Sequence, residues 1–178
     1  SFPRPFDTVN LPEKMQLFSK YENDGEMDFF DLIDPKISFD FLGGMFLSVF
    51  KRKNWVEKIN VLDCKAIIDS RTFSHFDNTF PHLKIFASAF SNSKAYFHSS
   101  PLSVNLSGER EWSNLSPLVN SIRLVEAVNE YRSKGLSLKK YLISFTVLIR
   151  DLYGTPSSLA AIRNSFMCLL PNSDSNTL

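Results

Sequence analysis

The sequence predicts a mixed α/β region over residues 1–112, followed by a helical segment over residues 113–178. Two observations support the first part: strand patterns at 37–52 and 94–100, and an amphipathic helix pattern between them at 81–90. From residue 116 onward, apolar residues recur at the three- and four-residue spacing of helices. With 178 residues, the chain is long enough for one domain with an apolar core, or for a small domain with a helical appendix.

The composition narrows the classes of function. Seventeen phenylalanines supply much of the core-forming surface. The net charge of +1 argues against nonspecific DNA binding, which requires a basic stripe. Cys64 and Cys168 lie far apart and have no metal-ligand spacing, so two free thiols in a reducing compartment are expected. No run approaches the roughly 18 apolar residues of a membrane span.

The first elements after a looping entry at 1–14 are two short helices, predicted at 13–21 and 26–33 and separated by a turn-like stretch. Residues 37–52 are almost continuously apolar and predict a strand buried on both faces, or two pieces joined at Gly43-Gly44. A short helix is expected at 53–60, and residues 60–79 are polar and expected to be irregular.

The clearest single element of the first region is the helix at 81–90. Pro81 suits a first helical turn because its missing N–H costs nothing there, and Asn78 or Thr79 could cap it. A strand follows at 94–100 and ends before Pro101. The expected inward face of the helix comprises Leu83, Phe86, Ala87 and Phe90.

Three helices are predicted in the second region. The first begins at Ser116-Pro117 and ends at Gly135, which suits the position just past a helix end. The second begins at Ser137, and the third begins at Thr155-Pro156 and stops at Pro171. Their expected inward stripes are Leu118, Ile122, Val125 and Val128; Leu138, Leu142, Phe145 and Ile149; and Leu159, Ile162, Phe166 and Leu169.

The stretch SHFDNTFPHLKIF, residues 74–86, holds the first candidate site: Asp77, His75 and His82. A carboxylate or imidazole at the entrance of a helix can act as a general base. The helix N-terminus favours an ionised Asp77 and a neutral His82 that can accept a proton. The alternative is an aspartate near a helix cap with two partly exposed histidines, and spacing alone favours it.

Two other places are candidates for binding. Gly43 and Gly44 lack side chains, so a ligand could lie against their backbone, or they form a bulge that fits crowded phenylalanines. In the loop SVNLSGEREW, Arg110 could hold a phosphate or carboxylate and Trp112 could stack on a sugar ring. The alternatives are a surface arginine and a tryptophan that covers the core.

Taken in order, three segments resemble the C-terminal half of family 2 glycosyltransferases, especially the abequosyltransferase-like enzymes of bacterial O-antigen assembly. The segments are FDFLGGMFLSVFKRKNW, TFPHLKIFASAF and KAYFHSSPLSVNLSGEREW, within residues 37–112. The matching motifs are an apolar strand leading to Arg52-x-x-Trp55, the helix start Phe80-Pro81-His82, and a strand ending in Pro101-Leu102.

The resemblance implies a GT-A fold, a Rossmann-like mixed sheet whose first half binds a nucleotide sugar and whose second half binds the acceptor. Residues 1–112 would be the acceptor-side part of this domain and 113–178 a helical appendix. It also implies inversion at the anomeric centre, with a base that deprotonates the acceptor hydroxyl. Many relatives have an acidic residue where this chain has His82, so the resemblance implies that His82 or the nearby Asp77 would take that role.

The remaining implications concern ligands and partners. Gly43, Gly44, His75, Arg110 and Trp112 would contact the substrates. A divalent metal, Mg or Mn, is expected in the complete enzyme but not in this chain, which has no D-x-D motif. The expected partners are a nucleotide-sugar donor, a saccharide or lipid-linked acceptor, and the absent N-terminal half or a second copy, but no nucleic acid.

The resemblance places the protein in the cytoplasm, with peripheral association at the inner face of the plasma membrane. Without the nucleotide-binding half, we expect no sugar transfer by this chain alone. The alternative function is a non-catalytic interaction or scaffold domain with a Phe-rich core. A hydrolase is disfavoured because no nucleophile with an adjacent base can be named.

Overall fold

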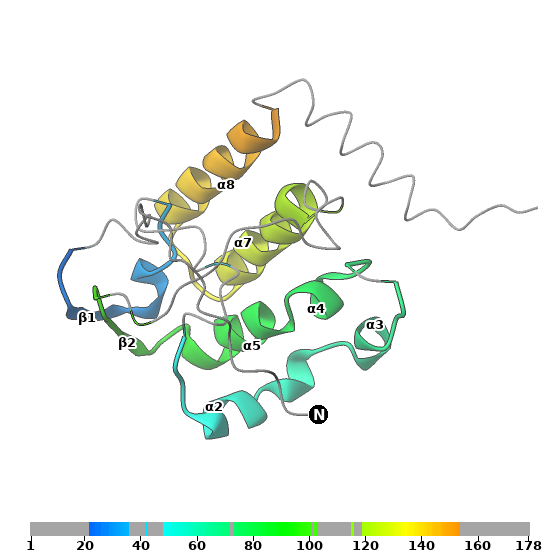
Figure 1. The fold of residues 1–178 in the computed structure, drawn as a ribbon, viewed down its shortest axis with the longest axis horizontal. Helices are drawn as coiled ribbons and strands as arrows, with labels where there is room; N and C mark the ends of the chain where they lie inside the picture. The colour runs from blue at the N-terminus through cyan, green and yellow to red at the C-terminus, as the bar shows by residue number, and fades with distance from the viewer. Residues whose placement is uncertain are drawn as a thin grey trace, which may run out of the picture.

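The computed structural model describes residues 22–35, 42, 48–71, 73–100, 102, 115 and 119–153. This part of the chain is mixed α/β and mostly helical, with a small antiparallel sheet of two strands (Figure 1). Most of the predicted strand at 37–52, including Gly43 and Gly44, lies outside the described residues. Where that segment is described it is not a strand: Leu42 is helical and residues 48–50 have no regular structure.

The sheet pairs β1 (Gly25–Asp28) with β2 (Lys94–Phe97). Gly25 lies opposite Phe97, and Asp28 lies opposite Lys94, with which it forms an exposed ion pair of 2.8 Å. The structure therefore confirms a strand in the predicted stretch 94–100, although the strand ends at Phe97. It contradicts the helix predicted at 26–33, which is replaced by β1 and a 3-10 turn, η1 (Phe29–Asp31). Pairing with a strand some 70 residues away overrides the local helical pattern.

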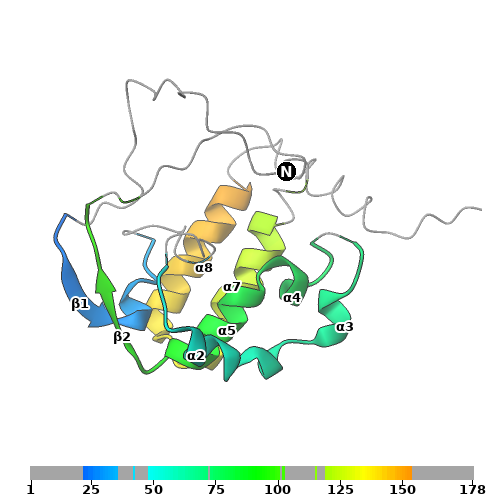
Figure 2. The same ribbon diagram turned by 60° about the horizontal axis from the view of Figure 1, so that its bottom comes forward.

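Four short helical elements follow one another along one edge of the molecule (Figures 1 and 2). They are α2 (Arg52–Val56), the 3-10 turn η3 (Ile59–Val61), α3 (Cys64–Ile67) and α4 (Phe76–Thr79). The helix predicted at 53–60 is confirmed in its first part by α2, which ends at Val56. The prediction that 60–79 is irregular is wrong in part, because single helical turns form in it.

The helix α5 (Pro81–Phe90) has the predicted extent, with Pro81 in its first turn. Its predicted cap is wrong: Phe80 is the N-cap and makes no side-chain cap hydrogen bond. Asn78 instead accepts a hydrogen bond of 3.1 Å from the His75 N–H and so supports the start of α4. The buried residues of α5 are His82, Leu83, Ile85, Phe86 and Ala87.

From residue 119 onward the second region forms a π-helical turn, η5 (Val119–Arg123), that continues into α7 (Leu124–Ser133). Gly135 has φ +112°, which confirms the predicted helix end, because this conformation is rarely adopted by residues with a side chain. Ser116, Pro117, Leu118 and the whole helix predicted from Thr155 lie outside the described residues.

The helix α8 (Leu138–Tyr153) is present, but its predicted inward stripe is wrong at Leu138 and Leu142, and the side chain of Ile149 lies outside the described ones. Leu138 and Leu142 are 56% and 52% exposed. The buried positions are shifted by one residue, to Ser144 and Leu148, with Tyr141 half-buried against the core. Apolar residues occur on more than one side of α8, so periodicity alone could not choose the face. The Tyr141 hydroxyl donates a 3.0 Å hydrogen bond to Asn129 of α7 and helps to fix the orientation.

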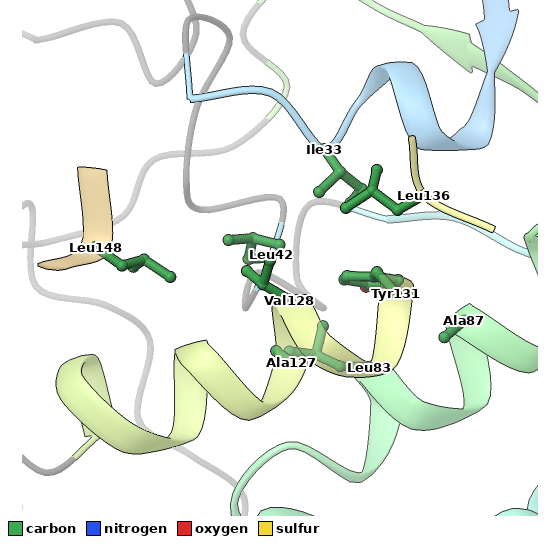
Figure 3. Packing of buried hydrophobic residues seen from close by; sticks show 9 residues of the cluster. All are labelled: Ile33, Leu42, Leu83, Ala87, Ala127, Val128, Tyr131, Leu136 and Leu148. Carbon is green, nitrogen blue, oxygen red and sulfur yellow. The ribbon is translucent and has the colours of Figure 1, made fainter. Parts of the chain in front are cut away.

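One apolar core connects the two predicted regions (Figure 3). Tyr131 of α7 is fully buried, and the rings of Phe29 and Phe30 lie edge-on to it at 6.0 Å. Because α7 packs against both α5 and α8, the helices after residue 119 belong to the same core as the first region. The core residues are Ile33, Leu42, Leu83, Ala87, Ala127, Val128, Tyr131, Leu136 and Leu148.

Candidate functional site

Three of the predicted site residues lie around the junction of α4 and α5. His75 is the N-cap of α4, Asp77 lies within α4, and His82 is the second residue of α5. Asp77 and His82 are 5% and 8% exposed, whereas the His75 side chain is 45% exposed. Asp77 and His82 are therefore surrounded by other parts of the protein, whereas the His75 side chain is partly in contact with solvent.

Asp77 is held by two partners. Lys84 Nζ donates to both of its carboxylate oxygens, at 3.1 and 2.8 Å, and the backbone N–H of Asp63 donates to Oδ2 at 2.6 Å. This carboxylate connects the residue before α3 to α4 and, through Lys84, to α5. A buried carboxylate needs such charged and hydrogen-bonding partners. These contacts are typical of a structural anchor. To act as a base, Asp77 would have to give up these hydrogen bonds before its carboxylate could accept a proton from a substrate.

His82 lies in aromatic surroundings. Its ring is edge-on to Phe80 and Phe86, with ring centroids 5.9 Å apart in both pairs. Phe86 is also contacted edge-on by Trp55 of α2, at 5.9 Å, and Trp55 stacks on Phe50 at 5.3 Å. His82 and Trp55 therefore share one aromatic neighbour, although they are 27 residues apart in the sequence.

The residue of α5 that the structure shows hydrogen-bonded to Asp77 is Lys84. Lys84 is two residues after His82 on α5. Residues two apart in an α-helix differ by about 200° around its axis, so Lys84 and His82 point to nearly opposite sides. The carboxylate anchor and the imidazole therefore serve different faces of α5.

His75 belongs to an exposed polar cluster with Asp69 and Arg71. Its Nε2 lies 2.9 Å from Asp69 Oδ2, and Arg71 donates to both carboxylate oxygens of Asp69, at 3.1 and 2.8 Å. The hydrogen bonds from Arg71 lower the pKa of Asp69 well below its usual value, with a smaller contribution from His75. Because Asp69 is ionised, His75 Nε2 is expected to carry the proton and donate it.

Arg123 fixes the backbone that precedes His75. Its Nε donates to the Phe73 carbonyl at 3.0 Å, one terminal nitrogen donates to the Ser74 carbonyl at 2.5 Å, and the other pairs with Glu126 at 2.5 Å. Phe73 has φ +61°, a conformation that a bulky residue rarely adopts. The buried guanidinium therefore holds a strained turn in place from η5.

Sequence reasoning missed Lys84 and Arg123. Each had a signal: Lys84 is the one charged residue of PHLKIFASAF, and Arg123 lies between Ile122 and Leu124 within an apolar run. A charge on an apolar helix face requires a buried partner, but the sequence does not show which carboxylate or carbonyl supplies it.

The other predicted contacts, Gly43, Gly44, Arg110 and Trp112, lie outside the described residues. Within the described ranges, no group of three or more His, Cys, Asp or Glu side chains is placed to hold a metal ion. Nor does any helix in that part of the chain have the length and apolar character to cross a membrane.

Comparisons with protein-family models, with curated proteins and with solved structures gave no match.

Proposed function

We propose that this chain is the acceptor-binding part of an inverting, nucleotide-sugar-dependent family 2 glycosyltransferase of bacterial surface-polysaccharide assembly. The described helices and strand pair would form the acceptor side of a GT-A domain, and a segment with a D-x-D motif would supply the metal and nucleotide site. Transfer would require both parts.

The observation that carries this proposal is an aromatic neighbour, Phe86, that is shared by two of the motifs on which the resemblance depends. Trp55, from Arg52-x-x-Trp55, and His82, from Phe80-Pro81-His82, both pack against Phe86 at 5.9 Å. Two short motifs with a common functional site are expected to meet in space, whereas chance matches have no reason to do so. The helix and strand that the resemblance requires also begin where expected, at Pro81 and Lys94.

In this proposal His82 is the base that accepts the proton of the acceptor hydroxyl. It lies at the N-terminal end of the ten-residue helix α5, edge-on to the rings of Phe80 and Phe86. An acceptor hydroxyl would have to reach the ring through the small part of this residue that stays exposed, which is 8%. Asp77 positions α5 through Lys84 and does not itself touch the acceptor.

A non-catalytic scaffold is the second candidate, and one observation favours it. A histidine buried edge-on between Phe80 and Phe86 is what a core position would show. The anchor made by Asp77 and Lys84 fits either function. The two candidate functions make different predictions for His82. The transferase requires a saccharide to bind beside its ring, whereas the scaffold does not.

The test is an NMR titration of the whole chain, labelled with 15N at its three histidine rings, with a panel of hexose and deoxyhexose disaccharides. We expect the His82 ring signals to shift on saturation with at least one disaccharide, and those of His98, which follows β2, to stay in place. His82→Gln should weaken that binding about fivefold to tenfold, the usual effect of one hydrogen bond, while His98→Gln should not. If no disaccharide moves the His82 signals, the scaffold is the better explanation.

A further inference from the structure

The helix α8 has an apolar face that is exposed to solvent. An open hollow of about 280 Å³ on this face is lined by Leu142, Ile143, Thr146 and Val147. These positions are related as i, i+1, i+4 and i+5, which places their side chains on one side of an α-helix. Leu142 and Ile143 are 52% and 37% exposed. We call this surface the outer face of α8.

The opposite side of α8 belongs to the core. Leu148 is part of the core cluster, and Ser144, one turn before it, is fully buried. Ser144 and Leu148 come two positions after Leu142 and Thr146, a rotation of about 200° around the helix axis. They therefore lie almost opposite to the outer face, on the side where α8 packs against α7 (Figure 1). A helix that is apolar on two sides is typical of a helix that is covered on both, and α7 covers one of them.

The next segment of the chain has the sequence pattern of a second neighbour for α8. Residues 155–170, TPSSLAAIRNSFMCLL, lie outside the described residues. Their spacing of apolar residues predicts a helix with one apolar stripe, which comprises Leu159, Ile162, Phe166 and Leu169. An isolated helix of this length is only marginally stable in water, so it needs an apolar surface to pack against.

The connection between α8 and this segment is short. The bounds of α8 extend to Tyr153, Gly154 suits the position just past a helix, and Thr155-Pro156 suits the start of the next one. Two helices joined by so few residues are usually antiparallel neighbours. The segment is therefore expected to turn back along α8.

The length of the segment matches the outer face. At 1.5 Å per residue, a helix over residues 156–170 would be about 22 Å long, close to the length of about 24 Å of the 16-residue helix α8. Counting away from the connection along both helices, Ile162 comes level with Val147, and Phe166 comes level with Ile143. Two residues of the predicted stripe thus meet two residues that line the hollow.

We propose that the outer face of α8 binds residues 155–170 of the same chain, folded back as an antiparallel amphipathic helix. A second copy of the chain is a poorer occupant, because it must be captured from solution, whereas a tethered segment has a high effective concentration beside α8. In this arrangement α8 lies between α7 and the C-terminal helix. The inference does not depend on the glycosyltransferase proposal.

The experiment is hydrogen exchange of the whole chain, without any sugar, followed by mass spectrometry. We expect the amides of residues 159–169 to exchange at least about tenfold more slowly than those of an unstructured peptide of the same sequence, because an undocked helix of this length frays. The protection should not change when the protein is diluted about a hundredfold, since the contact is within one chain. Loss of protection on dilution would show that a second copy covers the face and would overturn the proposal.

Aspartate substitutions on the two sides of the contact test its location. Leu142→Asp and Phe166→Asp each place a carboxylate in the apolar contact, and each should speed exchange of residues 159–169 at least about tenfold while α7 stays protected. The matched controls are Ile68→Asp, at an 81% exposed position after α3, and Asn164→Asp, away from the predicted stripe. Both controls should leave the protection unchanged.

Three results would overturn the proposal besides the effect of dilution. They are exchange of residues 159–169 in wild type at the rate of an unstructured peptide, no effect of Leu142→Asp on their protection, and an equal effect of Ile68→Asp. If Leu142→Asp also releases the amides of α7, Phe166→Asp decides, because it leaves the sequence of α8 unchanged. Since no saccharide is present, failure here would leave the glycosyltransferase proposal untouched.

Discussion

Two regions of this molecule are held together by different forces. The core around Tyr131 depends on apolar burial: Val128, Tyr131 and Leu136 have no exposed surface. The segment at residues 63–79 buries few apolar side chains and depends instead on two buried charged residues, Asp77 and Arg123. Apolar packing tolerates some change of shape, whereas each charged anchor depends on particular partner atoms.

The helix α5 belongs to both regions. Leu83 and Ala87 pack into the core, while Lys84 binds the carboxylate of Asp77. The candidate site at the start of α5 is therefore positioned by the core from one side and by the 63–79 segment from another. Substitutions in the core should therefore change the free energy of unfolding by a different amount from substitutions that affect the 63–79 segment.

The largest effect is expected in the core. Leu83→Ala should lower the free energy of unfolding by about 2–5 kcal/mol, because Leu83 is 1% exposed and its removal leaves a cavity. The measurement is urea-induced unfolding followed by circular dichroism. Ile68→Ala, at a position 81% exposed, is the control and should change the free energy by less than about 0.5 kcal/mol. Equal losses would contradict the placement of the core.

A smaller loss is expected at the anchor of the 63–79 segment. Asp77→Ala leaves the Lys84 ammonium without its partner and the Asp63 N–H without its acceptor, and should cost about 2–3 kcal/mol. The Lys84 side chain is 25% exposed, so water relieves part of the penalty. Adding Lys84→Met should recover about 1 kcal/mol in a double-mutant cycle. Strict additivity of the two substitutions would contradict a direct pair.

The guanidinium of Arg123 should contribute somewhat less. Arg123→Lys keeps the charge but cannot reach the Phe73 and Ser74 carbonyls together, and should cost about 1–2 kcal/mol. The exposed Arg132, which donates to one carbonyl, that of Leu136, provides the control, Arg132→Lys. Thermal unfolding of the two variants should show the larger loss for Arg123→Lys, and the reverse order would argue against the clamp.

The smallest effect at neutral pH is expected for Tyr131→Phe. In the described part of the chain nothing accepts from or donates to the buried Tyr131 hydroxyl, so its removal should leave stability unchanged or raise it by up to about 1 kcal/mol. A larger loss of stability would indicate a hydrogen bond to this hydroxyl.

The same variant has a pH signature. Burial raises the pKa of the Tyr131 phenol above its ordinary value of 10.0. The unfolded chain ionises this phenol first, so the stability it contributes is complete below pH 10.0 and falls as the pH rises above it. Tyr131→Phe should therefore lose less stability than wild type at alkaline pH. Tyr96→Phe, at a position 68% exposed, should behave as wild type.

Elements with strong local signals could be predicted from the sequence. Pro81 marked the start of α5, Gly135 marked the end of α7, and the pattern at 94–100 marked β2. Elements that depend on distant partners could not. The strand β1 forms because β2 lies beside it, and the inward face of α8 is chosen by α7, with which Tyr141 is hydrogen-bonded.

The candidate site shows the same limit. The polar pattern around Pro81 drew attention to His75, Asp77 and His82, and the structure places all three at the α4–α5 junction. The different surroundings of Asp77 and His82 come from Lys84 and from Phe86. Such tertiary contacts produce no periodic pattern in the sequence. The hydrogen bonds from Arg123 to the Phe73 and Ser74 carbonyls, for example, join residues about 50 positions apart.

Native-state hydrogen exchange at low urea tests most directly the claim that these two regions are held separately. In wild type, we expect the amides of α3 and α4 to exchange through an opening of smaller free energy, and weaker urea dependence, than the amides of α7. In Asp77→Ala, the free energy of that opening should fall further towards zero. A single opening free energy shared by α3, α4 and α7 in wild type would contradict the account, because the 63–79 segment would then unfold only with the core.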